Sequence, residues 1–104
     1  MNQQVNTFLF IEGQTGALAG EWYAVPRSER THISVALSLQ SGTCTWEVQG
    51  RNEPADDAQT LDTGSADEAI SVVRMNQMRV ILTAASAATF RATCDTPMRE
   101  IEEL

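Results

Sequence analysis

Residues 31–49 read THISVALSLQSGTCTWEVQ, and the alternation of apolar and polar side chains in this stretch decides the fold class. Thr31–Leu39 and Thr43–Gln49 both place an apolar side chain at every second position, which is the period of a half-buried strand. The inward-facing residues are Ile33, Val35, Leu37 and Leu39 in the first segment and Cys44, Trp46 and Val48 in the second. The intervening Gln40–Gly42 is typical of a turn, so we predict a β-hairpin.

The rest of the chain supplies shorter segments that alternate in the same way. Further strands are expected at Gln77–Thr83 and Ala88–Asp95, joined by Ala84–Ala87, and at Ala69–Val73, Asn6–Ile11 and Glu21–Val25. Their inward-facing residues include Met78, Val80 and Leu82, then Ala88, Phe90, Ala92 and Cys94. Residues Gly50–Glu68 are rich in Gly, Pro, Asp and Ser, which indicates a long loop with one short edge strand near Thr60–Leu61.

These strands, without a long amphipathic helix, predict an all-β chain built as a single β-sandwich. Jelly-roll and immunoglobulin-like strand orders both stay open. A length of 104 residues corresponds to one domain, so we assign residues 1–104 to one sandwich. The irregular residues 1–30 leave an extended N-terminal arm open, and residues 97–104 are expected to form a C-terminal tail, either one helical turn or extended.

The charge balance argues against two classes of partner. The net charge is −7 and the isoelectric point is about 4.5, whereas nucleic acids and anionic membranes select for basic faces. All seven cationic side chains are arginine, which suits partly desolvated contacts in interfaces, although a coding bias explains the same composition. The N-terminus resembles neither a signal peptide nor a membrane span, so we expect synthesis in a cytoplasm.

The residue types that carry chemistry are scattered in this sequence. Cys44 and Cys94 lack CxxC spacing and a nearby histidine, so we expect no zinc site. Both face the same inner side, which leaves a disulfide between them open, but a cytoplasmic origin favours free buried thiols. The single histidine, His32, also has no partner at ligand spacing. No pair of carboxylates or nucleophile–base pair can be assembled, so we expect no enzyme activity, no catalytic residue and no cofactor.

The loop at Gly50–Glu68 is the most acidic part of the chain. Its carboxylates are Asp56, Asp57, Asp62, Asp67 and Glu68. Oxygen ligands of this kind hold Ca²⁺ in proteins, but the spacing of a calcium loop is absent. We therefore expect a solvated surface loop and no metal.

A family resemblance rests on two motifs, TWEVQGRN and MRVILTAASAATFRATCD, separated by the acidic loop. The matching residues are Val48, Gly50 and Asn52, then Arg79, Val80, Leu82, Thr83, Ala84, Ala85, Ser86, Ala88 and Thr89. In this order they resemble the small β-sandwich proteins encoded in the structural gene clusters of tailed bacteriophages. In that group a strand ends in a V-x-G-x-N-like turn, and a hairpin near the C-terminus closes the sheet. The resemblance covers about the C-terminal two thirds of the chain.

The resemblance implies a virion component, and specifically a capsid decoration, or cement, protein. Such proteins bind the major capsid protein lattice on the capsid exterior, often as homotrimers, and clamp neighbouring subunits. A tail protein or a head-to-tail connector protein is the alternative within the same group. The expected contact residues are Phe8, Phe10, Trp22, Tyr23, Arg27 and Arg30, with an ordinary core role equally open for Phe8 and Phe10.

A carbohydrate-binding β-sandwich module is the alternative from another class. It requires an exposed aromatic platform with polar groups nearby, which Trp22 or Tyr23 beside Glu21 would supply. Because Trp22 and Tyr23 are adjacent, a strand would direct them to opposite faces and expose one of them.

Overall fold

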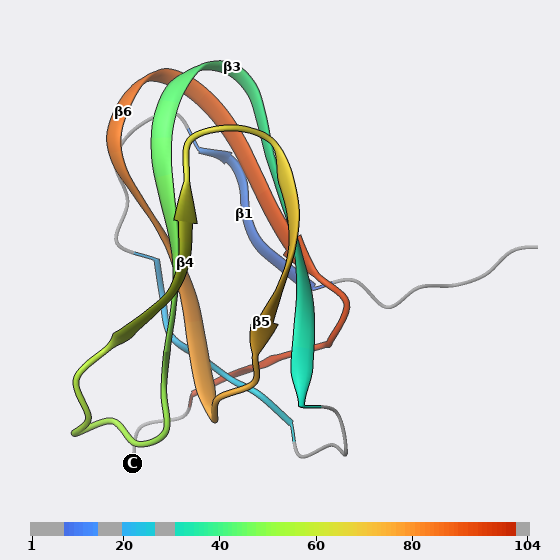
Figure 1. The fold of residues 1–104 in the computed structure, drawn as a ribbon, viewed down its shortest axis with the longest axis vertical. Helices are drawn as coiled ribbons and strands as arrows, with labels where there is room; N and C mark the ends of the chain where they lie inside the picture. Colours follow the sequence, from blue (N-terminus) through green and yellow to red (C-terminus); the bar gives the residue numbers. More distant parts are fainter. Residues whose placement is uncertain (1–7, 15–19, 27–30, 102–104) are drawn as a thin grey trace, which may run out of the picture.

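The computed structural model describes residues 8–14, 20–26 and 31–101, without the side chains of residues 11–14 and 84–88, and these residues form an all-β chain (Figure 1). The strands are β1 (Phe8–Gln14), β2 (Tyr23–Ala24), β3 (His32–Arg51), β4 (Gln59–Gly64), β5 (Glu68–Val73), β6 (Gln77–Cys94) and β7 (Arg99–Glu100). The predicted all-β class is confirmed. No helix in the described part of the chain is long and apolar enough to cross a bilayer.

Two long strands, β3 and β6, form the centre of the sheet. They pair antiparallel over nearly their whole lengths, from Val35 opposite Cys94 to Arg51 opposite Gln77. Both predicted hairpins are therefore wrong, because each pair of predicted strands is one continuous strand. The two predicted turns face each other in the ladder, with Ser41 opposite Thr89 and Thr43 opposite Ser86.

The turn-forming residues mark a shared bend of β3 and β6, visible as the arch at the top of Figure 1. The pairing register shifts three times between Leu39 and Thr45, and Gly42 has a φ of 76°. Such bulges insert unpaired residues and bend a strand without ending it. The inward face changes from odd-numbered residues up to Leu37 to even-numbered residues from Cys44, so the bulged bend lets both halves of β3 face one core.

Gly42 is exposed, so replacing it tests the backbone of the bend separately from packing. A valine there is expected to lower the free energy of unfolding by about 1–2 kcal/mol, because a β-carbon opposes the left-handed conformation. Asparagine tolerates that conformation better and is expected to cost less. Urea unfolding of both variants measures the difference. Equal losses for Val and Asn would contradict a conformational requirement at this position.

Shorter strands extend the two halves of the bent sheet. One half has the order β5–β3–β6–β1, with Leu37 opposite Glu68 and Phe8 opposite Cys94. The other half has the order β4–β3–β6–β2–β7. The result is one curled antiparallel sheet whose two halves share β3 and β6.

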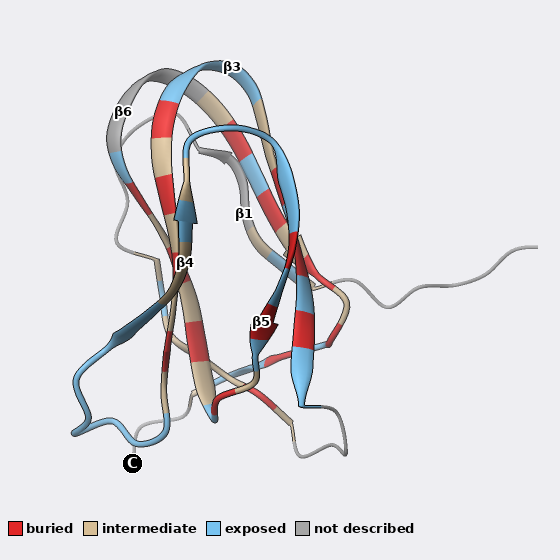
Figure 2. Cartoon of the chain, in the orientation of Figure 1, coloured by how far each residue is buried: buried red, intermediate tan, exposed pale blue. Residues whose placement is uncertain are grey.

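The core draws on both halves of this curl. Figure 2 shows buried positions along β3 and β6 in each half. The buried residues on β3 and β6 are Ile33, Val35, Leu37, Cys44, Trp46, Val48, Met78, Val80, Leu82, Phe90, Ala92 and Cys94, which confirms the predicted facing for each. Leu39 is only half-buried, and the side chain of Ala88 lies outside the description.

Trp46 is the largest fully buried side chain. Its Nε1–H donates to the carbonyl oxygen of Ala66 at 3.0 Å, in the connection between β4 and β5. A β-carbon on Gly64 would lie 2.5 Å from the Trp46 ring, so only glycine fits there without a shift. The ring thus holds the β4–β5 connection against the core.

The described parts of the two termini lie in the sheet. Within residues 1–30, where an extended arm was left open, β1 pairs with β6, and β2 lies between β6 and β7. Within residues 97–104, where a tail was expected, β7 pairs with β2 in the sheet. Both ends therefore extend the same side of the central β3–β6 pair.

Candidate functional site

Trp22 lies on the outer face of the sheet, beside two arginines. Tyr23 pairs with Met78, so the preceding residue, Trp22, falls next to Arg79 on the neighbouring strand. The guanidinium carbon of Arg79 is 4.6 Å from the centroid of the Trp22 ring, and that of Arg51 is 4.2 Å away. Each such cation–π contact contributes about 0.5–1 kcal/mol at an exposed site.

Neutral side chains hold both arginines in place. Arg51 Nε donates to Gln77 Oε1 at 2.6 Å, and Arg51 Nη1 donates to the carbonyl oxygen of Pro54 at 3.2 Å. Arg79 Nε donates to Gln49 Oε1 at 2.8 Å. Among the described residues, no carboxylate oxygen lies within 4.0 Å of either guanidinium group. In the part of the chain that the structure describes, both charges are therefore oriented without direct contact with a carboxylate.

One acidic group in this network is Glu47, which other side chains already engage. Glu47 Oε2 accepts hydrogen bonds from Gln49 Nε2 at 2.8 Å and from the Thr60 hydroxyl. These hydrogen bonds lower the pKa of Glu47, and the charge of Arg79 adds a smaller contribution in the same direction. Glu47 thus stays ionised near neutral pH while bound to neutral partners.

Two residues of the C-terminal segment complete the surface. Ile101 lines a hollow together with Trp22, Arg51 and Glu21. Arg99 is exposed and pairs with Ala24, which lies two residues from Trp22 on the same face. We call the set Trp22, Arg51, Arg79, Arg99 and Ile101 the Trp22 surface.

The other predicted aromatic residues form a separate cluster at the edge of the core. The ring centroids of Phe8 and Tyr23 are 4.7 Å apart and those of Phe8 and Phe10 are 5.2 Å apart, both edge-to-face. All three rings are partly buried against the core. Burial, and then the charges of Glu21 and Glu100, raise the pKa of Tyr23. Because Tyr23 packs against the core and follows Trp22 directly in an extended segment, its side chain points away from the face that carries Trp22.

The structure describes four of the six predicted contact residues, and they lie in two separate places. Trp22 lies on the outer face, whereas Phe8, Phe10 and Tyr23 pack against the core. Arg27 and Arg30 lie outside the described residues. Sequence reasoning missed the remaining members of the Trp22 surface, which are Arg51, Arg79, Arg99 and Ile101. Alternation directs Arg79 outward, but only the pairing register places it beside Trp22.

Both cysteines are buried and free, as predicted. Cys94 Sγ donates to the carbonyl oxygen of Thr96 at 3.1 Å. Burial, reinforced by the nearby charge of Asp95, raises the pKa of Cys94 to about 11, and burial also raises the pKa of Cys44. Neither thiol is therefore a ready nucleophile at neutral pH.

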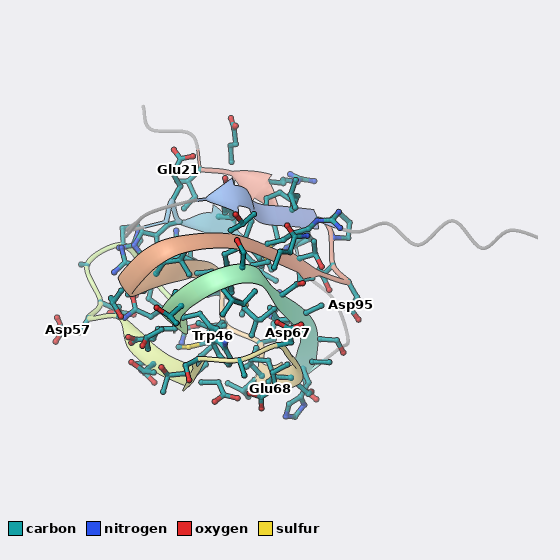
Figure 3. The ribbon with its side chains drawn as sticks, turned by 90° about the horizontal axis from the view of Figure 1, so that it is seen from above. Glu21, Trp46, Asp57, Asp67, Glu68 and Asp95 are labelled. Carbon is teal, nitrogen blue, oxygen red and sulfur yellow. The ribbon has the colours of Figure 1, made fainter. Side chains whose placement is uncertain are left out.

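The carboxylates of the acidic segment bind backbone groups of the fold. Asp56 Oδ2 accepts from the N–H of Glu53 at 3.1 Å, and Asp67 Oδ1 accepts from the N–H of Leu39 at 2.7 Å, beside the bend in β3. Figure 3 shows Asp57 far from Asp67 and Glu68. In the described part of the chain, no three His, Cys, Asp or Glu side chains form a group suited to a metal ion.

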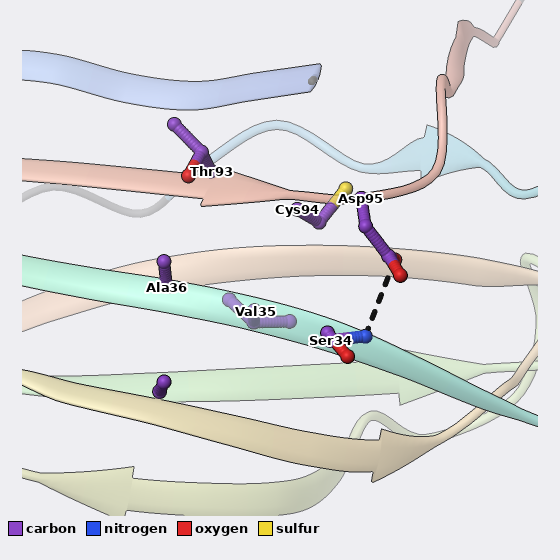
Figure 4. A pocket seen from close by; sticks show the side chains of 7 residues that line it. Ser34, Val35, Ala36, Thr93, Cys94 and Asp95 are labelled. Atoms are coloured by element: carbon purple, nitrogen blue, oxygen red, sulfur yellow. Dashed lines mark hydrogen bonds between the residues drawn. The ribbon is translucent and has the colours of Figure 1, made fainter. Parts of the chain in front are cut away.

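A second hollow, of about 190 Å³, lies over the half of the sheet that contains β5. Its lining includes the small side chains of Ser34, Ala36, Ala69 and Thr93 (Figure 4). At its rim, Asp95 Oδ1 accepts from the N–H of Ser34 at 3.3 Å. The hollow follows from the small size of these residues and offers little convergent polar chemistry.

No protein-family model, curated protein or solved structure matches this chain. The Trp22 surface is the described feature whose residue types and arrangement are best suited to recognising another molecule.

Proposed function

We propose that this protein is a structural protein of a tailed bacteriophage, a decoration (cement) protein that binds and stabilises the major capsid protein lattice. In this proposal it is made in the host cytoplasm, joins the virion on the capsid exterior and acts as a homotrimer. The two halves of the curled sheet serve as the layers of one β-sandwich, which is the rigid body of the clamp. The proposed role involves no catalysis, no cofactor, no nucleic acid and no membrane.

The Trp22 surface is the observation that carries the proposal. Tryptophan and arginine are enriched among the residues that dominate protein–protein binding energy. Arg51 and Arg79 are already oriented by Gln77 and Gln49, so less side-chain freedom is lost when a partner binds. A half-buried tryptophan beside two oriented guanidinium groups is thus suited to anchor a protein interface.

The phage assignment depends on the resemblance at Val48, Gly50 and Asn52. A β-carbon on Gly50 would lie 2.7 Å from the sulfur of Met75, which explains the glycine. Asn52 accepts two hydrogen bonds from Asn76, one at its side-chain oxygen and one at its carbonyl oxygen, just after β3 ends. The second motif gives less support than its pattern suggested, because residues 79–89 bend within β6 and form no hairpin.

The carbohydrate-binding alternative requires an open aromatic face. Trp22 is in contact with two guanidinium groups, and the Tyr23 ring packs against Phe8 and Phe10. Because both candidate platforms are engaged, the geometry favours the protein interface.

Co-sedimentation with expanded capsids, assembled from the major capsid protein of the same genome, tests the proposal. Replacing Trp22 by alanine is expected to cost about 2 kcal/mol of binding free energy, or roughly a thirtyfold loss of affinity. Val73→Ala, at an exposed apolar position on β5, is the control and is expected to bind normally.

Light scattering of the unbound protein is expected to give the mass of a trimer.

Two outcomes would contradict the proposal at different points. Failure of the unaltered protein to sediment with capsids would remove the decoration role. Normal binding by Trp22→Ala would remove the Trp22 surface as the contact while leaving the role in place.

A further inference from the structure

We infer that the Trp22 surface binds an acidic peptide segment of its partner, with carboxylates paired to Arg51 and Arg79 and an apolar side chain against Trp22 and Ile101. The inference rests on the proposed function in one respect, namely that this surface is a contact with another protein. It adds the chemistry of the segment that is recognised.

The charges on this surface are opposite to those of the protein as a whole. The chain carries a net charge of −7, yet Arg51 and Arg79 lie beside one ring and Arg99 is on the same face, two strands from β6. Two carboxylates lie nearby, and both keep their negative charge: Glu47 accepts from Gln49 and Thr60, and Glu21 accepts from the Tyr23 hydroxyl at 3.5 Å. The three guanidinium groups thus outnumber these carboxylates by one. A local excess of positive charge in an acidic protein attracts a carboxylate-bearing segment.

Within the described residues, the hydrogen bonds of the arginines leave their outer groups available for carboxylates. The Nε of each guanidinium is used by a glutamine, so the Arg79 Nη groups and Arg51 Nη2 make no hydrogen bond within the described residues. Guanidinium groups bind carboxylates with short, charge-assisted hydrogen bonds, which are about twice as strong as neutral ones. Both groups lie within 4.6 Å of one ring centroid, so one short segment reaches both.

The apolar part of the surface favours a peptide over a nucleic acid as the bound segment. Trp22 and Ile101 line one hollow with Arg51 and Glu21, which offers a place for an aliphatic side chain next to a guanidinium group. Because Glu21 repels a carboxylate, the acidic residues of the segment are expected on the side of Arg51 and Arg79. A nucleic acid would bring many phosphates toward a protein that is acidic elsewhere, and the net repulsion opposes it. A short segment with acidic residues around one apolar residue fits both features.

The probe is a blocked pentapeptide with a central leucine flanked by glutamates, titrated against the full-length protein by calorimetry at low salt. Arg51→Gln combined with Arg79→Gln is expected to weaken binding at least about tenfold. Arg91→Gln, on the opposite part of β6, removes one positive charge, as Arg51→Gln or Arg79→Gln does alone. It is the matched control for these single variants and is expected to bind within about twofold of the unaltered protein. Raising the salt to 0.5 M is expected to weaken binding by the unaltered protein.

Four results would overturn the inference. One is an absence of binding, and another is equal binding by the double variant and by Arg91→Gln. Tighter binding after removal of residues 102–104 would assign the surface to the acidic end of the same chain. Tighter binding of a single-stranded oligonucleotide than of the peptide would assign it to nucleic acid. Capsid sedimentation is measured separately, so failure of the peptide with normal capsid binding removes this inference alone.

Discussion

Replacing Trp46 by alanine is expected to lower the free energy of unfolding by about 3–5 kcal/mol, the largest loss expected for any substitution discussed. The side chain is fully buried, and its removal leaves a cavity at the centre of the curl. It also leaves the carbonyl oxygen of Ala66 without its donor, which loosens the connection between β4 and β5. Urea unfolding followed by circular dichroism measures the loss.

Two matched variants separate the causes. Trp46→Phe keeps most of the apolar volume and removes the hydrogen bond, so a smaller loss than that of Trp46→Ala is expected. Gly64→Ala leaves the tryptophan in place but sets a β-carbon 2.5 Å from its ring, with an expected cost of about 1–3 kcal/mol. A loss below about 1 kcal/mol for Trp46→Ala would show that the ring is not packed as described.

Alkaline pH is expected to destabilise the protein through Cys94. Burial raises the pKa of this thiol from 9.0 to about 11 in the folded state. Below pH 9 the thiol is protonated in both states and the stability is fully present. As the pH rises from about 9 to 11, only the unfolded state loses the proton, so stability falls by about 3 kcal/mol in total.

Urea unfolding of the unaltered protein and of Cys94→Ala across pH 8–11 measures this effect. The alanine variant starts from a lower stability, but its curve is expected to fall less steeply with pH. Tyr23 and Cys44, whose pKa values are also raised, contribute equally to both curves. The chain has no lysine, so no ammonium side chain obscures the comparison. Parallel curves would refute the assignment to Cys94.

The alternation along β3 and β6 was readable from the sequence because burial follows a period of two. Ile33, Trp46 and Phe90 each lie on the face that this period predicts. The connectivity was not readable, because Gln40–Gly42 supplies the same residue types for a hairpin turn as for a bulged bend. What distinguishes the two is the partner of each strand, and that depends on pairing with residues about fifty positions away.

The interaction surface was predictable only in part for the same reason. An aromatic residue at Trp22 stands out in the sequence, and the opposite directions of Trp22 and Tyr23 follow from strand geometry. The arginines beside Trp22 come from β3 and β6, and the register of those strands depends on tertiary pairing that local residues do not encode. The candidates nearest in sequence, Arg27 and Arg30, lie outside the described residues.

The sharing of β3 and β6 by both halves of the sheet has a consequence for cooperativity. In a sandwich of two separate sheets, one sheet can fray while the other keeps its hydrogen bonds. Here the release of β3 from β6 at either end propagates through the bend, since the same two backbones continue into the other half. The two halves are therefore expected to unfold as a single unit. A mechanical force applied to one half is transmitted to the other through the backbones of β3 and β6.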